Sequence, residues 1–147
     1  MPAPAWKRPE SVLVVVHTAD QVLLLERVRP AGFWQSVTGS LEAGETAGQA
    51  AIRELGEETG FDGREIRDLG LVQTFRIAPA WRERYAPDVV ENRETAFALC
   101  LASAAEPRVN PAEHRQFRWF GVDQALETAS SHTDAAAIEQ IFRPGSG

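Results

Sequence analysis

Hydrophobic residues along this chain gather into short runs that predict β-strands. The first run, residues 11–17, is rich in valine and predicts a buried strand, and the turn and second run that follow predict a hairpin. The last run carries three aromatic side chains and is expected to be a loop that leads into a strand. Extended segments are expected over residues 11–17, 22–28, 33–38, 69–77, 95–102 and 113–120.

A different spacing predicts helices. Ile52 and Leu55 recur at helical spacing, so we expect both to face the core from a helix over residues 47–58. Thr46 is positioned to cap the start of this helix, and Gly60 to end it. Two shorter helices are expected over residues 123–128 and 134–142.

Strands interspersed with helices are typical of an α/β fold, in which a mixed sheet carries helices on its faces. The 147 residues suffice for one domain, residues 1–147, with a sizeable core. Residues 78–94 interrupt the strands with polar side chains and two prolines. That composition is compatible with a lid over a binding site.

The bulk composition excludes several classes of protein. Net charge is -6 and the isoelectric point is about 5.1, which argues against binding a nucleic acid polymer through a basic surface. No apolar run is long enough to span a membrane. The single cysteine, Cys100, lies in an apolar stretch and is expected to be a buried small hydrophobe, so the chain suits the reducing cytoplasm.

The most specific feature is the pattern G-x5-E-x7-R-E-U-x-E-E-x-G-U over residues 39–61, where U is apolar. Glu54, Glu57 and Glu58 fall on one face of the predicted helix, three or four residues apart. Such carboxylates repel one another unless a cation lies between them, and hard divalent cations prefer oxygen ligands. The alternative is an ordinary solvated acidic face.

This pattern resembles the Nudix box, and the chain is identified as a member of the Nudix hydrolase family. The resemblance implies a Nudix α/β/α sandwich with a mixed sheet and an enzyme that cleaves a diphosphate linked to another moiety. It also implies Mg²⁺ as the cofactor, with Mn²⁺ as the alternative. A metal ion there would neutralise phosphate charge, orient the phosphate chain and lower the pKa of an attacking water.

The resemblance implies Glu54, Glu58 and Glu113 as the metal-binding carboxylates. Nudix enzymes take the proton of the attacking water either with a glutamate of the box or with a residue on a distant loop. Glu57 and Glu113 are therefore both candidates for the general base. Glu113 follows a proline-containing turn and precedes the aromatic strand, and the neighbouring His114 is the second choice outside the box.

Arg53 is expected to orient the acidic face rather than to take part in the reaction directly. It lies four residues before Glu57 and can pair with that side chain or reach Glu45. Glu45 also falls near the start of the helix, where the dipole favours a carboxylate. A capping role and a metal-linked role both remain open for Glu45.

Segments outside the box resemble Nudix members that act on a pterin triphosphate. They include WKRPESVLVVV, FWQSVTGS directly before the box, RERYAPDV in the insert and EHRQFRWF near the end. The match is weak over residues 61–72 and 130–136. This closer resemblance implies hydrolysis of 7,8-dihydroneopterin triphosphate to the monophosphate and pyrophosphate, a step of folate biosynthesis.

A flat pterin needs an aromatic ring to stack on and polar groups at its rim. Phe33, Trp34 and Gln35 lie directly before the box and are candidates for both roles, although Trp34 has a core position as its alternative. Basic residues are the candidates for contact with the triphosphate, because arginine suits phosphate oxygens. These candidates, each with a plain surface position as the alternative, are Lys7, Arg27 and Arg84.

Two other functions compete with this interpretation. A Nudix hydrolase of (deoxy)nucleoside triphosphates or dinucleoside polyphosphates would share the box and differ in the pocket. A non-catalytic Nudix-fold module would bind a nucleotide or a protein, but such a module has no use for carboxylates that repel one another. The expected partner is thus a small-molecule triphosphate, with no membrane, and the protein is expected to be a monomer or a homodimer.

Overall fold

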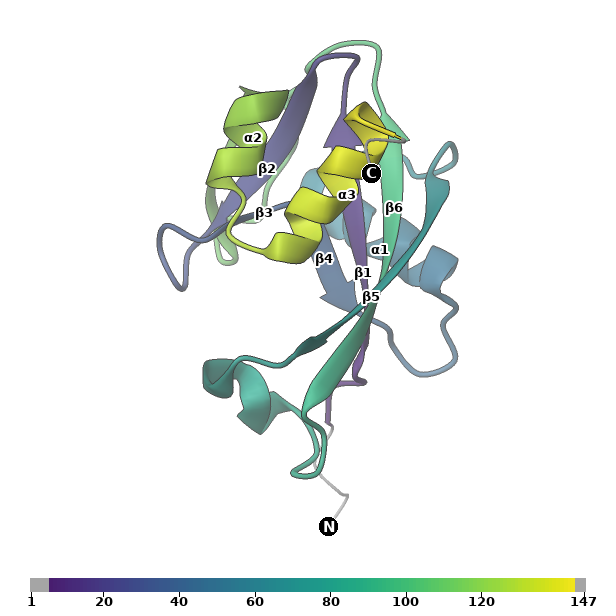
Figure 1. Cartoon of the computed structure of the whole chain (residues 1–147), viewed down its shortest axis with the longest axis vertical. Coiled ribbons are helices and arrows are strands. Elements are labelled where there is room, and N and C mark those ends of the chain that lie inside the picture. Colours follow the sequence, from purple (N-terminus) through teal and green to yellow (C-terminus); the bar gives the residue numbers. More distant parts are fainter. Residues whose placement is uncertain (1–5, 145–147) are drawn as a thin grey trace.

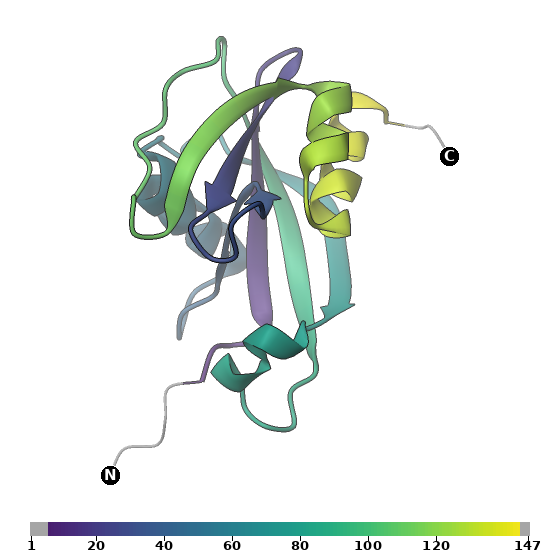
Figure 2. The ribbon, with the colours of Figure 1, turned by 90° about the vertical axis from the view of Figure 1, so that its left-hand side faces the viewer.

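A mixed β-sheet separates two layers of helices. The computed structural model describes residues 6–144, and within them helix α1 (Ala47–Thr59) covers one face of the sheet. Helices α2 (Val122–Thr128) and α3 (His132–Phe142) cover the other face (Figures 1 and 2). None of the helices in this described part is long and apolar enough to cross a membrane.

The sheet has seven strands within residues 6–144. They are β1 (Glu10–His17), β2 (Gln21–Arg27), β3 (Trp34–Gln35), β4 (Val37–Ser40), β5 (Arg67–Arg76), β6 (Glu91–Cys100) and β7 (His114–Gly121). The main order is β3-β2-β1-β6-β5, with β4 paired to β1 and β7 paired to β2. The β1–β6 pair is parallel and the other pairs are antiparallel.

One edge of β1 is divided between two partners. Its His17 end pairs with β2, whereas its stretch from Ser11 to Val14 pairs with β4. Strand β4 leads directly through a short loop into α1, so the segment before the acidic helix is anchored in the sheet. This connection fixes where the acidic helix lies relative to β4.

Strand β1 is covered on both faces, which explains its unbroken apolar sequence. Val12, Val14 and Val16 pack on the α1 side with Leu55, and Leu13 and Val15 pack on the side of α2 and α3. All six side chains are at most 2% exposed. Burying each of them contributes about 1.5–3 kcal/mol relative to an exposed position.

The predicted caps of the acidic helix are confirmed. Thr46 and Gln49 form a reciprocal capping box, in which each side chain accepts a hydrogen bond from the other residue's backbone. Gly60 ends the helix with φ 78°, a left-handed conformation that costs glycine little. The predicted strands and the two shorter helices are also present, with ends shifted by a few residues.

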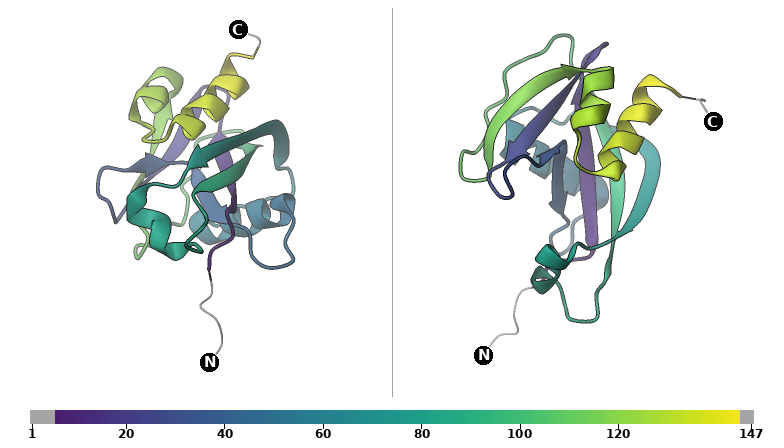
Figure 3. Two further views of the ribbon diagram at one scale, coloured as in Figure 1. Left: turned by 60° about the horizontal axis from the view of Figure 1, so that its bottom comes forward. Right: turned by 60° about the vertical axis from the view of Figure 1, so that its left-hand side comes forward.

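Three expectations are wrong in detail. Ile52 is 46% exposed, because it lies on the flank of α1 against the loop at Gly63, while Ala51 and Leu55 face the core. Cys100 is exposed, because it is the last residue of β6 and lies beyond the buried part of the strand, which ends at Leu99. The polar insert is shorter than expected, because β6 already begins at Glu91. The remaining insert contains a 3₁₀ helix, η1 (Pro79–Arg84) (Figure 3).

Candidate active site

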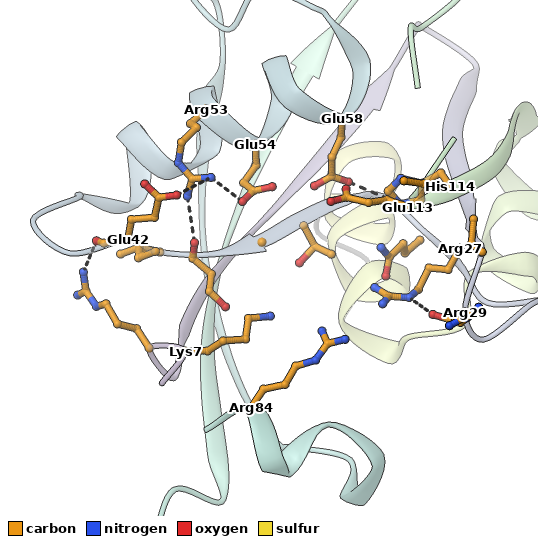
Figure 4. A pocket seen from close by; sticks show the side chains of 18 of the residues that line it. Lys7, Arg27, Arg29, Glu42, Arg53, Glu54, Glu58, Arg84, Glu113 and His114 are labelled. Carbon is orange, nitrogen blue, oxygen red and sulfur yellow. Dashed lines mark hydrogen bonds and ion pairs between the residues drawn. The ribbon is translucent and has the colours of Figure 1, made fainter. Parts of the chain in front are cut away.

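Most of the predicted site residues line one cavity of about 920 Å³. Acidic side chains from α1 and from the loop before β7 lie on one side, and basic side chains face them across the cavity (Figure 4). The predicted residues that line it are Lys7, Arg27, Gln35, Arg53, Glu54, Glu58, Arg84, Glu113 and His114. Glu57, Phe33 and Trp34 are not among its lining residues.

Helix α1 presents Glu54 and Glu58 to the cavity from successive turns. The Glu58 side chain is buried, with 4% exposed, and the Glu54 side chain is partly buried, with 15% exposed. The backbone of Gly39 in β4 lies directly against the Glu54 carboxylate, so closely that a methyl group built at Gly39 would overlap it. A glycine at this position therefore makes room for the carboxylate.

The Arg53 guanidinium ties the acidic helix to β4 and to the loop before the helix. Its Nε and Nη2 donate to the two carboxylate oxygens of Glu45 at 2.7 and 2.9 Å, and Nη1 donates to Glu54 at 2.8 Å. Nη2 also donates to the backbone carbonyl of Ser40 at 3.1 Å. Charge-assisted bidentate contacts of this kind are stronger and more directional than ordinary hydrogen bonds.

Glu45 braces Arg53 and does not cap the helix, since Thr46 holds that position. The hydrogen bonds from Arg53, with a further one from the backbone N–H of Glu42, lower the pKa of Glu45 to about 2. Arg53 in turn has a raised pKa, first because of Glu45 and then because of Glu54. The predicted contact between Arg53 and Glu57 is also present at 3.4 Å, but the Glu57 side chain is 60% exposed.

A tight turn holds Glu113 at the cavity. The backbone N–H groups of Glu113 and His114 both donate to the carbonyl of Asn110, at 3.0 and 2.9 Å. The Glu113 carbonyl accepts from the backbone N–H of Val28 at 2.9 Å, which anchors the turn to the end of β2. The Glu113 side chain is exposed to the cavity, next to Glu58 (Figure 4).

Glu58 lies in an unfavourable environment for a lone carboxylate. Burial raises its pKa, and the neighbouring Glu54 and Glu113 carboxylates raise it further. Its Oε1 atom has no hydrogen-bond partner among the described residues, and His114 Nε2 lies 3.7 Å away. Burial, together with the charge of Arg27, lowers the pKa of His114 to about 4. The His114 ring is therefore neutral at pH 7 and cannot compensate the negative charge of Glu58.

These observations fit a divalent cation. Glu54, Glu58 and Glu113 supply hard oxygen donors, and Glu58 has a buried oxygen without a partner. Among residues 6–144 no group of three or more His, Cys, Asp or Glu side chains is already gathered tightly enough to enclose an ion. Mg²⁺ does not need such a cage, because it keeps several waters and takes only one or two carboxylates directly.

The basic side chains facing the carboxylates repel one another. Burial lowers the pKa of Lys7, and the nearby charges of Arg84 and Arg27 lower it further. The Arg27 guanidinium stacks over the ring of Trp81, with 5.5 Å to the ring centre. Lys7 and Arg84 are exposed and Arg27 is half-buried, and all three line this cavity. Three cations around one cavity are suited to a polyanion such as a phosphate chain.

A second cavity of about 180 Å³ adjoins the first, and Lys7, Arg27 and Arg84 line both. Its walls are aromatic and come from three separate parts of the chain. They are Phe33, Phe75, Trp81 and Tyr85. We call this second cavity the aromatic slot. Of the residues predicted to hold a pterin, Phe33 and Gln35 line the slot, whereas Trp34 points away and packs edge-on against Phe120 in the core.

Sequence reasoning missed three polar residues of the aromatic slot. Asn92 and Glu94 are buried at 2% and 5% exposure, and Asp134 at 1%. Asn92 and Glu94 fall within the predicted polar insert, whereas in the structure Asn92, Glu94 and Ala96 alternate as one buried face of β6. A predicted strand that began at residue 91 instead of 95 would have included this alternation of buried and exposed residues.

Comparison with known proteins is consistent with this geometry. Residues 7–141 match the family model of the NUDIX domain, so the protein belongs to the Nudix family, and its α/β/α fold is the one seen in that family. It is a Nudix hydrolase.

Two relatives that align over most of their own length carry the name of the same activity. The dihydroneopterin triphosphate diphosphatase of Escherichia coli (strain K12) is 41% identical over 142 residues, which cover 92% of this chain and 93% of the relative. The Haemophilus influenzae protein of the same name is 37% identical over 143 residues, covering 93% and 89%. The solved structure of the E. coli dihydroneopterin triphosphate pyrophosphohydrolase has a TM-score of 0.88 and 39% identity, covering 95% of this chain and 98% of that one.

Replacing Gly39 with alanine tests whether the position of Glu54 matters. The new methyl group would displace the Glu54 carboxylate, which is the flexible end of a side chain, so the fold should survive. We expect kcat/KM to fall by about 10- to 100-fold, because small misplacements of a catalytic group are costly.

Gly56→Ala on the exposed face of α1, where nothing lies within 4 Å, is the matched control. It should keep full activity and gain about 0.5–1 kcal/mol of helix stability. Equal activity in the two variants would contradict the role assigned to Gly39.

Glu94 should make the protein less stable as the pH rises. Burial raises its pKa from 4.5 to about 7, so between these values the unfolded chain has lost a proton that the folded protein keeps. The free energy of unfolding should therefore fall from pH 5 to pH 8. Glu94→Gln should match the wild type at pH 5 and exceed it by about 1–3 kcal/mol at pH 8 in urea titrations. Identical pH slopes for the two proteins would refute this expectation.

Proposed function

We propose that this Nudix hydrolase converts 7,8-dihydroneopterin triphosphate into dihydroneopterin monophosphate and pyrophosphate, as a cytoplasmic enzyme of folate biosynthesis. One observation carries the proposal: an acidic face and a basic cluster line one cavity, and that cavity continues into an aromatic slot. The cavity suits a phosphate chain and the slot suits a flat heterocycle. Relatives that carry this activity in their names support the choice of substrate.

Mg²⁺ is the proposed cofactor, with Glu54, Glu58 and Glu113 as its ligands. When bound it would neutralise charge on the phosphates and make an attacking water more acidic. Arg53 keeps the Glu54 carboxylate turned toward the cavity through the 2.8 Å hydrogen bond, and Gly39 leaves space for it. The burial of Glu58 also gives a reason for metal affinity, because a cation would remove the penalty for its negative charge.

Lys7, Arg27 and Arg84 are the proposed contacts of the phosphate chain. They lie at the boundary between the cavity and the aromatic slot, and line both. A heterocycle in the slot would place its phosphates between these cations and the acidic face. The contact of Arg27 with the Trp81 ring, and the hydrogen bond from its Nε to the Arg29 carbonyl at 2.8 Å, restrain the side chain and so lower the entropy lost when it binds an anion.

Glu113 is the stronger candidate for the general base. Its side chain is exposed within the cavity, whereas Glu57 lies outside the lining residues and contacts Arg53. A general base has to come within hydrogen-bond reach of the attacking water, directly or through one further water. His114 is a weaker candidate. Its side chain is buried at the cavity wall, and neither ring nitrogen has a hydrogen-bond partner among the described residues.

A substrate panel tests the proposed activity. Pyrophosphate release should require a divalent cation, and EDTA should abolish it. With Mg²⁺, kcat/KM for dihydroneopterin triphosphate should exceed that for dATP and diadenosine tetraphosphate, because the aromatic slot holds the heterocycle as well as the phosphates. A clear preference for dATP would redirect the proposal to nucleoside triphosphates, and no release from any triphosphate would indicate a binding module.

Paired glutamine variants separate the two candidate bases. Glu113→Gln should lower kcat by about 10²–10⁴-fold in single-turnover measurements at saturating Mg²⁺, where the loss of the proton acceptor is measured with the metal site filled. Glu57→Gln should lower kcat far less, since that side chain is 60% exposed and lies outside the cavity lining. The opposite ranking would return the role to Glu57. Glu58→Gln should keep the fold and weaken metal binding measured by calorimetry.

A further inference from the structure

Three buried oxygen atoms in the aromatic slot have no hydrogen-bond partner among the described residues. They are Oε1 of Glu94, Oδ1 of Asn92 and Oδ1 of Asp134. Each side chain is at least nine-tenths buried, and all three residues line the slot. Buried acceptors without donors are rare in folded proteins, so each one calls for an explanation.

The other polar atoms around these oxygens hold them in place. The Asn92 amide donates through Nδ2 to the hydroxyl of Ser11 at 2.7 Å, which leaves its carbonyl oxygen unpaired. Asp134 accepts the backbone N–H of Ser36 through Oδ2 at 2.9 Å, which leaves Oδ1 unpaired. Hydrogen bonds therefore position the side chains of Asn92 and Asp134, and the Thr133 side chain hydrogen-bonds the third, Glu94.

The electrostatics agree with a site prepared for a donor ligand. Burial raises the pKa of Glu94 to about 7, and the Asp134 charge adds to the effect although the Thr133 side chain opposes it. Burial also raises the pKa of Asp134 to about 6. A ligand that brings N–H groups to these oxygens would replace the lost hydration of the carboxylates.

The shape and chemistry of the slot restrict the ligand. Its aromatic walls, which include Phe33 and Trp81, suit a flat ring system. Its unpaired oxygens accept hydrogen bonds, and so they need neighbouring donors in the plane of that ring. The 2-amino-4-oxopyrimidine edge, shared by pterins and guanine, presents an amino group beside a ring N–H. Adenine presents an amino group beside a ring nitrogen that only accepts, which would face a carboxylate unfavourably.

We propose that Glu94, assisted by Asn92 and Asp134, recognises the amino and ring N–H donors of a 2-amino-4-oxopyrimidine ring held in the aromatic slot. This inference deepens the proposed function, on which it rests for the phosphate end of the same ligand. Glu94 is thus a specificity-determining residue that contacts the heterocycle. The cations shared by the two cavities would lie between the ring and the acidic face.

The test compares Glu94→Gln with Glu91→Gln, an exposed glutamate at the start of the same strand that lines neither cavity. Binding of neopterin, guanosine and adenosine is measured without metal by calorimetry, so that no hydrolytic step contributes. The wild type should bind neopterin and guanosine more tightly than adenosine. Glu94→Gln should weaken neopterin and guanosine by about 10- to 100-fold, because a charged acceptor is lost, and leave adenosine unchanged or tighter. Glu91→Gln should behave as the wild type.

Steady-state kinetics give an independent measurement of the same residue. In Glu94→Gln the ratio of kcat/KM for the pterin triphosphate to that for dATP should fall by a similar factor, with activity on dATP retained as evidence of an intact metal site. An unchanged preference for neopterin over adenosine in Glu94→Gln overturns the inference, whatever the natural substrate is. If the wild type fails to hydrolyse the pterin triphosphate but Glu94→Gln still loses the preference in binding, the slot stands and the proposed function fails. The relative affinities of neopterin and guanosine then show which heterocycle it prefers.

Discussion

The ion pairs of Arg53 determine whether the site exists. One guanidinium holds both oxygens of Glu45, one oxygen of Glu54 and the Ser40 carbonyl, and so joins the helix, the loop before it and β4. Without Arg53, the Glu54 carboxylate would lose the charged hydrogen bond that holds it in place beside Glu58. Because only 22% of the Arg53 side chain is exposed, solvent screens these contacts less than it would screen an ion pair on the surface.

The molecule separates charge of opposite sign across one cavity instead of pairing it. Glu58 is held with a raised pKa and Lys7 with a lowered one, so each side lies in an environment that disfavours its own charge. Direct pairing of the two sides would relieve both, but it would close the cavity. A metal ion on one side and phosphates on the other would relieve both environments and leave the cavity open. The unliganded protein is therefore less stable than it would be with a neutral cavity, which is a common consequence of a functional site.

How far the sequence predicts this structure depends on how local each signal is. The acidic helix was predictable from Thr46 to Gly60, because caps and helical spacing are read from adjacent residues. Residue type made Lys7, Arg27 and Arg84 candidates for the phosphate chain, but no local signal shows that they line one cavity, because they come from separate parts of the chain and only the folded sheet brings them together. Glu94 was missed for a different reason. A polar residue on a buried face of a strand resembles a loop residue when the strand boundary is uncertain.

Phosphate chemistry cannot by itself select a substrate, since every triphosphate presents the same charges to the carboxylates and the basic cluster. Selection has to come from groups that contact the other end of the ligand. In this protein those groups are buried oxygens whose solvation has been removed, and an unsatisfied buried acceptor penalises a wrong ligand as well as rewarding the right one. A hydrophobic slot of the same shape would discriminate only weakly between flat rings. The polar end of the slot therefore explains how a general phosphate site can belong to an enzyme for one heterocycle.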